Sequence, residues 1–353
     1  MSKLKYGIIG TGNIAVSKHL TGYAALKDEV ELMAVCDNNK EAAERAAKQF
    51  GIPNVFTDYR NLLAMKDIDL ISVCTPNCLH APVTIEALEA GKHVHCEKPM
   101  AMNSEEAQEM LDTARKTGRK LMVGLNNRFT KETQFVKKYV DDGNLGEIYY
   151  IKCGWVRRSE IAPRGWFTDK ALSGGGSLID LGVHFIDLAM YFMNYPQPKS
   201  VVARTFCKFG NTGLCKLYTL EGIPTDVNKK FDVEDFAAGF IDLNNDACIT
   251  FEISWALNTE NERTFYELNG TKGGLCFNKS GLKIFTLVNG QQADIQPHIN
   301  GDFFGANEFR YFIECIRTGE EPVISPPEQG VAMMKLIDGI YRSAEERKQI
   351  EFH

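Results

Sequence analysis

The pattern of hydrophobic and polar positions changes about one third of the way along the chain. From Leu4 to about Gly124, short apolar runs alternate with segments whose apolar residues recur at helical spacing. The predicted strands are YGIIG, VELMAVCD, DLISVCTP, KHVHCEKP and KLMVGLN, and helices are expected from about Asn13, Lys40, Ala81 and Ser104. Strands that alternate with helices predict a parallel, doubly wound sheet.

After Gly124 the apolar runs become longer and alternate with polar residues. They are EIYYIKCGWV, KSVVARTF, VEDFAAGFIDL, ACITFEISWAL, RTFYELNG and LKIFTLV, separated by Asn and Gly turns. This pattern predicts a large, open, mostly antiparallel sheet with one face covered by helices, such as one over 177–193. We therefore predict an α/β protein of two domains: a doubly wound domain over 1–124 and a second α/β domain over 125–353, whose last helix begins near Glu328.

One connection in the second domain is unusually long. The segment from about Phe209 to Phe231 exceeds the length of an ordinary hairpin loop. Loops of this length are often functional. We predict that it borders the substrate pocket, with subunit contact as the alternative role.

Composition and charge agree with a soluble two-domain protein. The chain has 353 residues, of which 44% are hydrophobic and 24% charged, and its 40 basic and 46 acidic residues give a net charge of −6. Without a block of like charges there is no reason to expect nucleic acid or a membrane surface as a partner. Neither a leader-like start nor an apolar run long enough to span a bilayer is found, so we expect a cytoplasmic protein.

The ten cysteines indicate neither disulfides nor a metal site. They are scattered, mostly within apolar strand-like runs, and none forms a CxxC pair. We interpret them as reduced core thiols. His93, His95 and Cys96 lie close together, but alternate positions of a strand explain them better than a metal does, so we predict no metal.

The stretch GIIGTGNIA carries a nucleotide-binding pattern. Gly10, Gly12 and Ala15 form GxGxxA between a predicted strand and a helix, where glycines let the backbone approach a diphosphate at a helix N-terminus. The second strand ends in Asp37, whose carboxylate can accept hydrogen bonds from both ribose hydroxyls and repels a 2′-phosphate. We therefore predict NAD as cofactor. The residues expected around it here are Gly10, Thr11, Gly12, Asn13, Ile14, Asp37 and Asn38.

Two further turns follow predicted strands of the same sheet. In VCTPNCLHAP the strand ends in Thr75, Pro76 and Asn77, and His80 follows. Ligands of a doubly wound sheet lie beyond the carboxyl ends of its strands, so these four residues should border the cofactor.

In HCEKPM, Lys98 lies just past the next strand and before a proline, which favours an extended Lys98 backbone. The alternative is that Lys98 is an ordinary surface lysine without a role in catalysis. At the nicotinamide end of the crevice, its ammonium could instead hydrogen-bond a substrate hydroxyl and stabilise alkoxide charge.

The stretch GGGSLIDLGVH places Asp180 and His184 on one stripe of a nearly all-apolar helix, with Asp187 one turn further. Ser177 could cap this helix and Asp180 could complete a capping box, which would be a purely structural role. That role does not explain His184. A histidine one turn after an aspartate suits proton removal from a bound hydroxyl, and Gly174 to Gly176 would let the backbone approach a ligand.

Together these motifs resemble the family of glucose-fructose oxidoreductase, inositol dehydrogenase and rhizopine-catabolism proteins, often written GFO/IDH/MocA. The matching features are GxGxxA, Asp37, TPN..H, EKP, GGG..D.G.H and VEDFAAG, in this order over almost the whole chain. The resemblance implies an N-terminal Rossmann domain, a C-terminal α/β domain for substrate binding and oligomerisation, and a tightly bound nicotinamide cofactor.

The resemblance also assigns roles to residues. It implies that Lys98, Asp180 and His184 form the catalytic triad, that Glu97 and Lys98 also border the cofactor, and that Arg128 and Trp166 border cofactor or substrate. The substrate-binding set it implies is Lys98, Arg128, Arg157, Trp166, Asp180 and His184.

The activity expected from these roles is NAD-dependent oxidation of a secondary hydroxyl of a sugar, glycoside or cyclitol. Within the family the chain most resembles bacterial enzymes acting on glucosides, including those that oxidise the glucose 3-hydroxyl of C- or O-glycosides. A self-recycling oxidoreductase that retains NAD for oxo-sugar chemistry and a non-catalytic NAD- or sugar-sensing regulator are the alternatives. An open sheet normally needs cover, so we also expect a homo-oligomer: a dimer, tetramer or hexamer.

Overall fold

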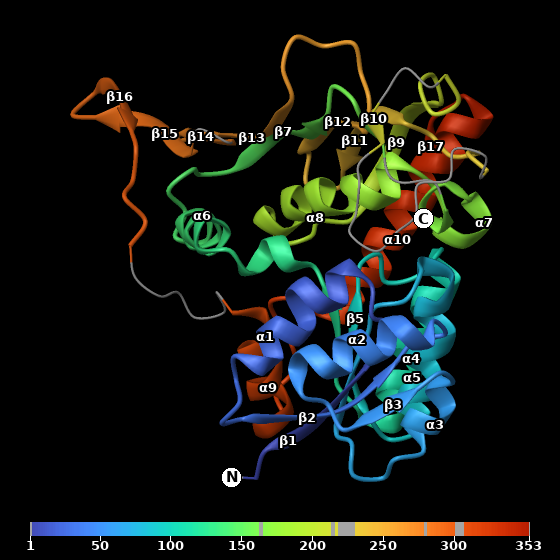
Figure 1. The fold of residues 1–353 in the computed structure, drawn as a ribbon. Coiled ribbons are helices and arrows are strands. Elements are labelled where there is room, and N and C mark those ends of the chain that lie inside the picture. Colours follow the sequence, from blue (N-terminus) through green and yellow to red (C-terminus); the bar gives the residue numbers. More distant parts are fainter. Residues whose placement is uncertain are drawn as a thin grey trace. The chain divides into compact units, whose positions relative to one another are not determined.

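The computed structural model describes residues 2–161, 165–212, 216–217, 230–278, 281–300 and 307–352 (Figure 1). The chain divides into two compact units. The first contains Met1–Asn126 and Asn307–Met334, and the second contains Asn127–Thr219, Pro224–Ala306 and Lys335–His353. Our prediction assigned the whole of 125–353 to the second domain. In the structure, Asn307–Met334 packs with the first unit.

A six-stranded parallel sheet forms the centre of the first unit, in the order β3-β2-β1-β4-β5-β6. Its middle strands are buried on both faces, which explains why they are continuous apolar runs in the sequence. The strands are β1 (Leu4–Ile9), β2 (Val30–Cys36), β3 (Asn54–Phe56), β4 (Leu70–Val73), β5 (His93–Glu97) and β6 (Leu121–Gly124). The doubly wound sheet is as predicted, and β3 is the one strand that the hydrophobic pattern did not reveal.

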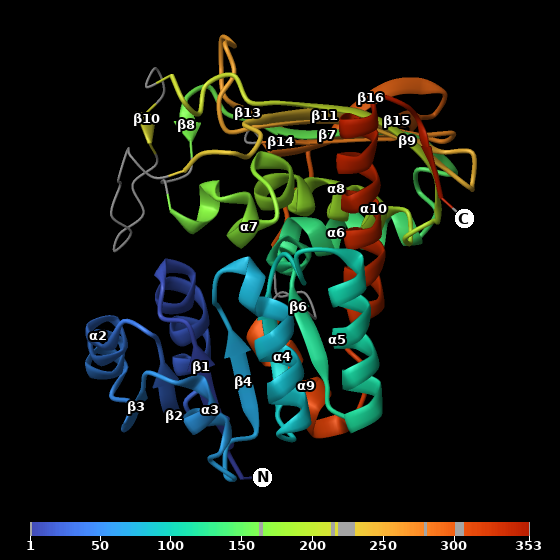
Figure 2. The same ribbon diagram turned by 90° about the vertical axis from the view of Figure 1, so that its right-hand side faces the viewer.

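The helices of this unit include one from the far end of the chain. α4 packs beside α5 (Figure 2), and α9 packs beside α1 (Figure 1). A π-helical segment, η1 (Ala15–Leu20), follows the glycine loop. The other helical segments are α1 (Thr21–Ala24), α2 (Lys40–Phe50), α3 (Tyr59–Leu63), η2 (Asn77–Leu79), α4 (His80–Glu89), α5 (Ser104–Thr117) and α9 (Glu308–Thr318). α10 (Pro327–Glu346) begins in this unit and ends in the second.

The second unit contains a nine-stranded sheet in the order β16-β15-β14-β13-β7-β12-β11-β9-β17. Its strand pairs are antiparallel except β7 with β12, which confirms the predicted mostly antiparallel sheet. The strands are β7 (Ile148–Val156), β9 (Pro198–Phe206), β11 (Phe236–Leu243), β12 (Cys248–Ser254), β13 (Arg263–Gly270), β14 (Gly274–Asn278), β15 (Gly281–Val288), β16 (Gln291–Ile295) and β17 (Ile350–Glu351). The short strands β8 (Glu160–Ile161) and β10 (Lys216–Leu217) pair separately.

One face of this large sheet is covered by helices, and α8 packs directly on β7 and β12 (Figures 1 and 2). α8 continues from a second π-helical segment, η5 (Leu178–Gly182). The helical segments are η3 (Asn126–Phe129), α6 (Lys131–Asp141), η4 (Trp166–Thr168), α7 (Lys170–Ser173), η5 and α8 (Val183–Phe192). Along β12, Ile249, Phe251 and Ile253 point into the core under these helices, which is the alternation expected from the sequence.

Two features of the described residues concern a membrane and a metal ion as partners. No helix among them combines the length and apolar character needed to cross a bilayer. In the same residues, no group of three or more His, Cys, Asp and Glu side chains is arranged to hold a metal ion.

Candidate active site

The glycine loop lies between the ends of two central strands. Gly10 has φ +89°, and a Cβ there would lie 2.4 Å from the carbonyl oxygen of Cys74 at the end of β4. Only glycine fits this turn without moving the backbone. Gly12 is exposed, and a Cβ on it would meet nothing within 4 Å. The loop is therefore closed on the sheet side and open on the side where a diphosphate would approach the helix N-terminus.

Asp37 contacts this loop from the end of β2. Its Oδ2 accepts hydrogen bonds from the backbone N–H of Thr11 at 2.8 Å and from the Thr11 hydroxyl at 2.9 Å, and its Oδ1 accepts from the Asn39 N–H at 2.9 Å. These bonds hold the carboxylate beside the loop. A dinucleotide fits here, because a carboxylate that recognises ribose hydroxyls must lie close to the diphosphate-binding backbone.

The turn after β4 supplies a further polar atom at the same sheet edge. The buried Oγ1 of Thr75 has no hydrogen-bond partner within the described part of the chain, which suits a ligand that could satisfy it. His80 contacts backbone carbonyls of two turns. Its ring is buried, with Nδ1 2.6 Å from the Pro99 carbonyl oxygen and Nε2 2.9 Å from that of Thr75. Burial lowers the His80 pKa, and both carbonyls oppose this shift. His80 thus joins the turn after β4 to the turn after β5, and its expected place beside the cofactor stays a prediction.

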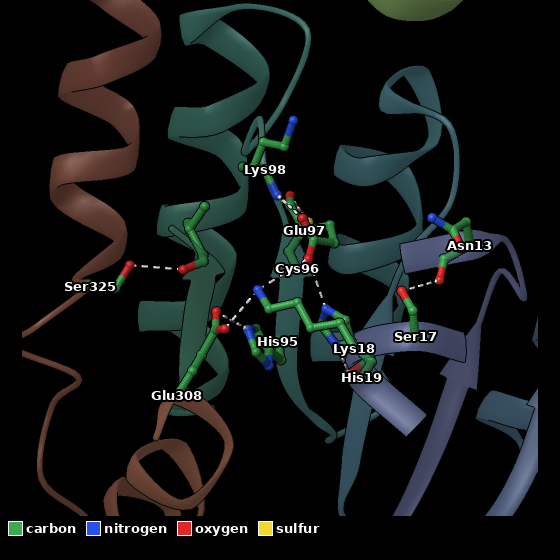
Figure 3. A network of polar contacts seen from close by, with 12 residues as sticks. Asn13, Ser17, Lys18, His19, His95, Cys96, Glu97, Lys98, Glu308 and Ser325 are labelled. Atoms are coloured by element: carbon green, nitrogen blue, oxygen red, sulfur yellow. Dashed lines mark hydrogen bonds and ion pairs between the residues drawn. The ribbon is translucent and has the colours of Figure 1, made fainter. Parts of the chain in front are cut away.

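Lys98 lies at the carboxyl end of β5, before a cis peptide bond to Pro99. Its backbone N–H donates to Glu97 Oε2 at 3.1 Å, while its amino group points away from the neighbouring carboxylates (Figure 3). Glu97 itself is buried. The carboxylate of Glu97 therefore holds the turn that carries Lys98, a role that sequence reasoning did not assign to it.

Glu97 belongs to a buried polar network that links three parts of the first unit (Figure 3). Oε1 of Glu97 accepts from His19 Nε2 at 2.9 Å, and His19 Nδ1 accepts from the hydroxyl of Ser72 at 2.9 Å. Lys18, on the same helical segment as His19, lies 3.9 Å from Glu97 Oε1 and 2.8 Å from Glu308 Oε2. The segment after the glycine loop is thus connected to the Lys98 turn through Glu97.

A second histidine of the network, His95, also contacts a glutamate with one ring nitrogen and a hydroxyl with the other. His95 Nε2 lies 3.2 Å from Glu308 Oε1, and His95 Nδ1 lies 3.1 Å from the hydroxyl of Tyr23. All three side chains are buried. The prediction that His95 is a core residue of a strand agrees with this placement. Sequence reasoning missed Glu308, because it lies 213 residues away on α9.

Charge keeps both carboxylates of the network ionised. Burial alone would raise the pKa of Glu97, but Lys18 and the hydrogen bond from His19 hold it well below its usual range. Burial opposes the shift of Glu308 as well, yet Lys18 and His95 lower its pKa to about 2. The pKa of Lys18 is raised, because the two carboxylates outweigh its burial. Each carboxylate of the network thus faces the ammonium of Lys18, as buried ions require a partner of opposite charge.

In the second unit, the helix that carries Asp180 and His184 is capped by a distant residue. Ser177 makes no side-chain cap, and the capping box expected with Asp180 is not formed. Instead Glu234 accepts hydrogen bonds from the N–H groups of Gly176 and Leu178, both at 2.9 Å. The structural explanation for Asp180 is therefore wrong: a carboxylate from the VED segment satisfies the helix start, and the side chain of Asp180 is used elsewhere.

The glycines before this helix also differ from expectation. A Cβ on Gly176 would lie 1.9 Å from the Glu234 carbonyl oxygen, and one on Gly175 would lie 1.9 Å from the Tyr341 hydroxyl. Tyr341 in turn donates to Glu234 Oε1 at 3.0 Å. In this structure these glycines allow close approach of protein segments, so the explanation of a ligand approaching them is not supported.

Asp180 and His184 lie on two joined helical segments. Asp180 is within η5, where Oδ2 accepts from the indole Nε1 of Trp255 at 3.0 Å, and His184 is at the start of α8. Both are partly exposed, in contrast to their apolar neighbours. π-helical turns within α-helices often occur at functional sites. The structure thus brings an acid and an imidazole together on one partly accessible stripe.

Asp187, the third polar residue of that stripe, pairs with Arg128. Nε of Arg128 donates to Asp187 Oδ2 at 2.8 Å, and its guanidinium also lies over the rings of Tyr191 and Tyr195 at 4.7 and 5.2 Å. Arg128 is 0% exposed. Burial alone would lower the pKa of Arg128, but the charges of Asp187 and Tyr195 outweigh burial and raise this pKa above its usual range. This geometry supports a structural role for Arg128, and its expected contact with cofactor or substrate stays a prediction.

The remaining predicted substrate residues lie in the second unit at or after the end of β7. The guanidinium of Arg157 lies 4.2 Å from the ring centre of Trp155, and its backbone N–H donates to Ser254 at the end of β12. Trp166 stacks on Phe167 with 3.7 Å between ring centres. Both side chains are partly exposed. Most of the predicted pocket loop, namely 213–215 and 218–229, lies outside the described residues.

The two units match the two halves of one protein family. Residues 4–125 match the oxidoreductase family with an NAD-binding Rossmann fold, and residues 137–352 match its C-terminal alpha/beta domain. The chain belongs to the GFO/IDH/MocA family. This match confirms the resemblance found from motifs. It also confirms the prediction of an NAD-dependent oxidoreductase with a Rossmann domain.

Individual members of the family match over most of the chain. D-glucoside 3-dehydrogenase of Escherichia coli (strain K12) is 36% identical, covering 99% of this chain and 98% of that protein. Levoglucosan dehydrogenase of Pseudarthrobacter phenanthrenivorans is 30% identical, covering 79% of this chain and 74% of that protein. A solved structure of levoglucosan dehydrogenase in complex with NADH aligns with a TM-score of 0.87 at 25% identity, covering 99% of each chain.

Proposed function

We propose that this GFO/IDH/MocA protein oxidises a secondary ring hydroxyl of a glucoside, with the glucose 3-hydroxyl as first choice. The observation that carries the proposal is the 36% identity, over nearly the full length of both chains, to an enzyme named D-glucoside 3-dehydrogenase. A second relative is named for levoglucosan, which makes sugars with a blocked anomeric carbon the class to test first.

The proposed chemistry divides between the two units. Bound NAD supplies the hydride acceptor. His184 removes the proton of the substrate hydroxyl, the ammonium of Lys98 stabilises the developing alkoxide, and Asp180 orients the reacting groups. This assignment is supported by the carboxyl-terminal position of Lys98 on β5 and by the partly exposed Asp180 and His184 on an otherwise buried helix.

The cofactor residues of the proposal are those at the open side of the glycine loop and the adjacent strand ends. They are Gly10, Thr11, Gly12, Asn13, Ile14, Asp37, Asn38, Thr75, Pro76 and Asn77. Asp37 carries the proposed preference for NAD over NADP. Arg157 and Trp166 remain the proposed substrate contacts of the second unit.

The deciding experiment is a substrate panel with the purified protein and NAD. Methyl glucosides, aryl glucosides, levoglucosan, free glucose and myo-inositol would be compared by NADH absorbance, with products identified by NMR. A 3-keto glucoside as the main product supports the proposal. No turnover of any member, or oxidation at another carbon, contradicts it. An absorbance spectrum of the protein as purified separates enzymes that retain reduced cofactor from those that release it.

We further propose that the protein is a homo-oligomer. The outer face of the large sheet carries the exposed apolar side chains of Val202 and Phe206 on β9 and of Phe240 on β11. Phe240 pairs with Val202, and the half-buried Phe236 pairs with Phe206. Apolar patches of this kind mark association surfaces. Light scattering of the wild type and of Phe240→Lys tests this: a multimer that dissociates in the variant supports the proposal, and a wild-type monomer contradicts it.

A reducing compartment, the cytoplasm, is the proposed location. The nine cysteines that the structure describes are free thiols, and most of them are buried or half-buried. Free thiols in this number suit a compartment that keeps thiols reduced. Subcellular fractionation would test the proposal, and recovery outside the cytoplasm would contradict it.

A further inference from the structure

The contact between Trp255 and Asp180 connects the end of a strand to the proposed active-site helix. Trp255 directly follows β12, and its indole Nε1 donates to Asp180 Oδ2 at 3.0 Å. The side chain of Trp255 is 0% exposed. An indole N–H can only donate, and a buried one needs an acceptor, so this bond satisfies the tryptophan and restrains the carboxylate at the same time.

The indole is itself held firmly. The backbone N–H of Trp255 donates to the Asp235 carbonyl oxygen and the Trp255 carbonyl oxygen accepts from Glu160, both at 2.9 Å. The ring packs edge-on against Phe231, with ring centres 6.4 Å apart. A short carboxylate on a helix has several orientations available, whereas an indole anchored in this way has one. The partner that sets the geometry is therefore Trp255.

We propose that Trp255 is a positioning residue for the reaction, acting through Asp180. The inference rests on the role of Asp180 in the proposed function. By holding Oδ2, the indole selects one orientation of the carboxylate for the substrate, and neither the cofactor nor the reacting atoms need to touch Trp255. Sequence reasoning could not find this residue, because it lies 75 positions from Asp180 in a run that predicts only a buried strand.

A specific pattern of kinetic effects follows from this role. Hydrogen bonds to charged groups are among the stronger ones, and a small misplacement of a reacting group is enough to slow chemistry. Trp255→Phe removes the N–H and keeps an aromatic ring in the buried site. We expect kcat to fall about 10-fold, with the Kd of NAD within about twofold of the wild type.

The test is a double-mutant cycle of Trp255→Phe and Asp180→Asn, with kcat, substrate KM and NAD Kd measured for each variant. If Trp255 acts through Asp180, Trp255→Phe changes kcat about 10-fold in the wild-type background and less than about twofold in the Asp180→Asn background. Any packing defect from the smaller ring is present in both backgrounds and cancels. Thermal melts verify that each variant is folded.

Tyr150→Phe is the matched control. The Tyr150 hydroxyl bonds to Thr250 Oγ1 at 2.8 Å across β7 and β12, so the variant also removes one hydrogen bond of an aromatic side chain from the same sheet. We expect its kcat to remain within about twofold of the wild type in both backgrounds, since the Tyr150 hydroxyl bonds to Thr250 and not to Asp180.

Three outcomes distinguish the possibilities. An equal loss of kcat from Trp255→Phe in both backgrounds overturns the proposal and makes Trp255 a packing residue. Wild-type kcat in Trp255→Phe beside a large loss in Asp180→Asn also overturns it, while leaving the proposed function standing. Wild-type kcat in Asp180→Asn alone contradicts the role of Asp180, and the inference fails with it.

Discussion

Two buried glutamates, one in each unit, hold the backbone beside a proposed catalytic residue, but they do so with different chemistry. Glu97 accepts from the Lys98 N–H and is surrounded by Lys18 and His19, which hold its pKa well below the usual range despite burial. Glu234 accepts from Gly176, Leu178 and Tyr341, all neutral donors. Burial raises the pKa of Glu234, and these donors oppose the shift only in part.

The difference shows how each unit uses charge. In the first unit a full negative charge is balanced by the half-buried Lys18, and the network extends through Lys18 to Glu308 and from Glu308 to His95. In the second unit a lone carboxylate relies on backbone amides at a helix start, where the helix dipole also favours negative charge. The first arrangement tolerates acid poorly, because protonating either glutamate removes one of the two negative charges that face the ammonium of Lys18. The second is sensitive to steric change at the glycines that let the chain approach.

The largest effect is expected from variants of Lys98 and His184, which test whether these two residues act in one reaction. His184→Asn removes the proposed base, and we expect kcat to fall by roughly 10²- to 10⁴-fold with NAD still bound. Lys98→Met removes the ammonium and should also lower kcat strongly. If both act in one step, the double variant is little worse than either single one. Steady-state kinetics at saturating NAD measures this, and near wild-type kcat in the single variants would mean that the site is misplaced.

A second prediction contrasts a closed glycine with an open one. Gly176→Ala places a Cβ 1.9 Å from the Glu234 backbone, so we expect a loss of unfolding free energy of about 1–3 kcal/mol. Gly12→Ala meets no protein atom within 4 Å, so stability should stay within about 0.5 kcal/mol while NAD affinity drops. Denaturant titration and NAD binding of both variants check this. Equal destabilisation by both would break the distinction.

The third prediction concerns the carboxylate beside the glycine loop. In Asp37→Ser the hydroxyl can still contact the loop, but the charge that repels a 2′-phosphate is gone. We expect the ratio of kcat/KM for NAD over NADP to decrease about 10- to 100-fold.

Asp58→Ser provides its control, because Asp58 caps α3 through the Arg60 N–H and a serine can cap equally well. The cofactor ratio of this variant should match the wild type. Equal kcat/KM for NAD and NADP in the wild type would contradict the proposed role of Asp37.

The smallest expected effect is on the pH dependence of stability. With a folded pKa of about 2 against an ordinary 4.5, Glu308 contributes stability above pH 4.5 that is lost as the pH falls toward 2. Glu234 has a raised folded pKa, so its contribution has the opposite sign and stability decreases as the pH rises above 4.5. Thermal melts from pH 3 to 7 give the free energy of unfolding as a function of pH. Below pH 4.5 this free energy should fall less steeply in Glu308→Gln than in the wild type, by on the order of 1–2 kcal/mol. Above pH 4.5 it should fall less steeply in Glu234→Gln. Identical slope changes in the two variants would contradict the comparison.

Much of the first unit could be predicted from the sequence because its signals are local. A glycine loop between a strand and a helix, an acid at the end of the next strand and Lys98 after a buried strand are each readable within a few residues. The alternation of strands and helices then places all of them at one edge of the sheet.

What only the tertiary structure decided is which side chain each of these residues meets. Ser177 and Asp180 match a capping box in sequence, yet Glu234 caps the helix and Trp255 binds Asp180. Arg128 gives no sign in the sequence of its partner in the core, which is Asp187. The partners lie more than 50 residues apart along the chain, and local propensity carries no information about them. Hydrophobic periodicity determines the elements, whereas the pairing of buried charges and donors depends on which elements pack together.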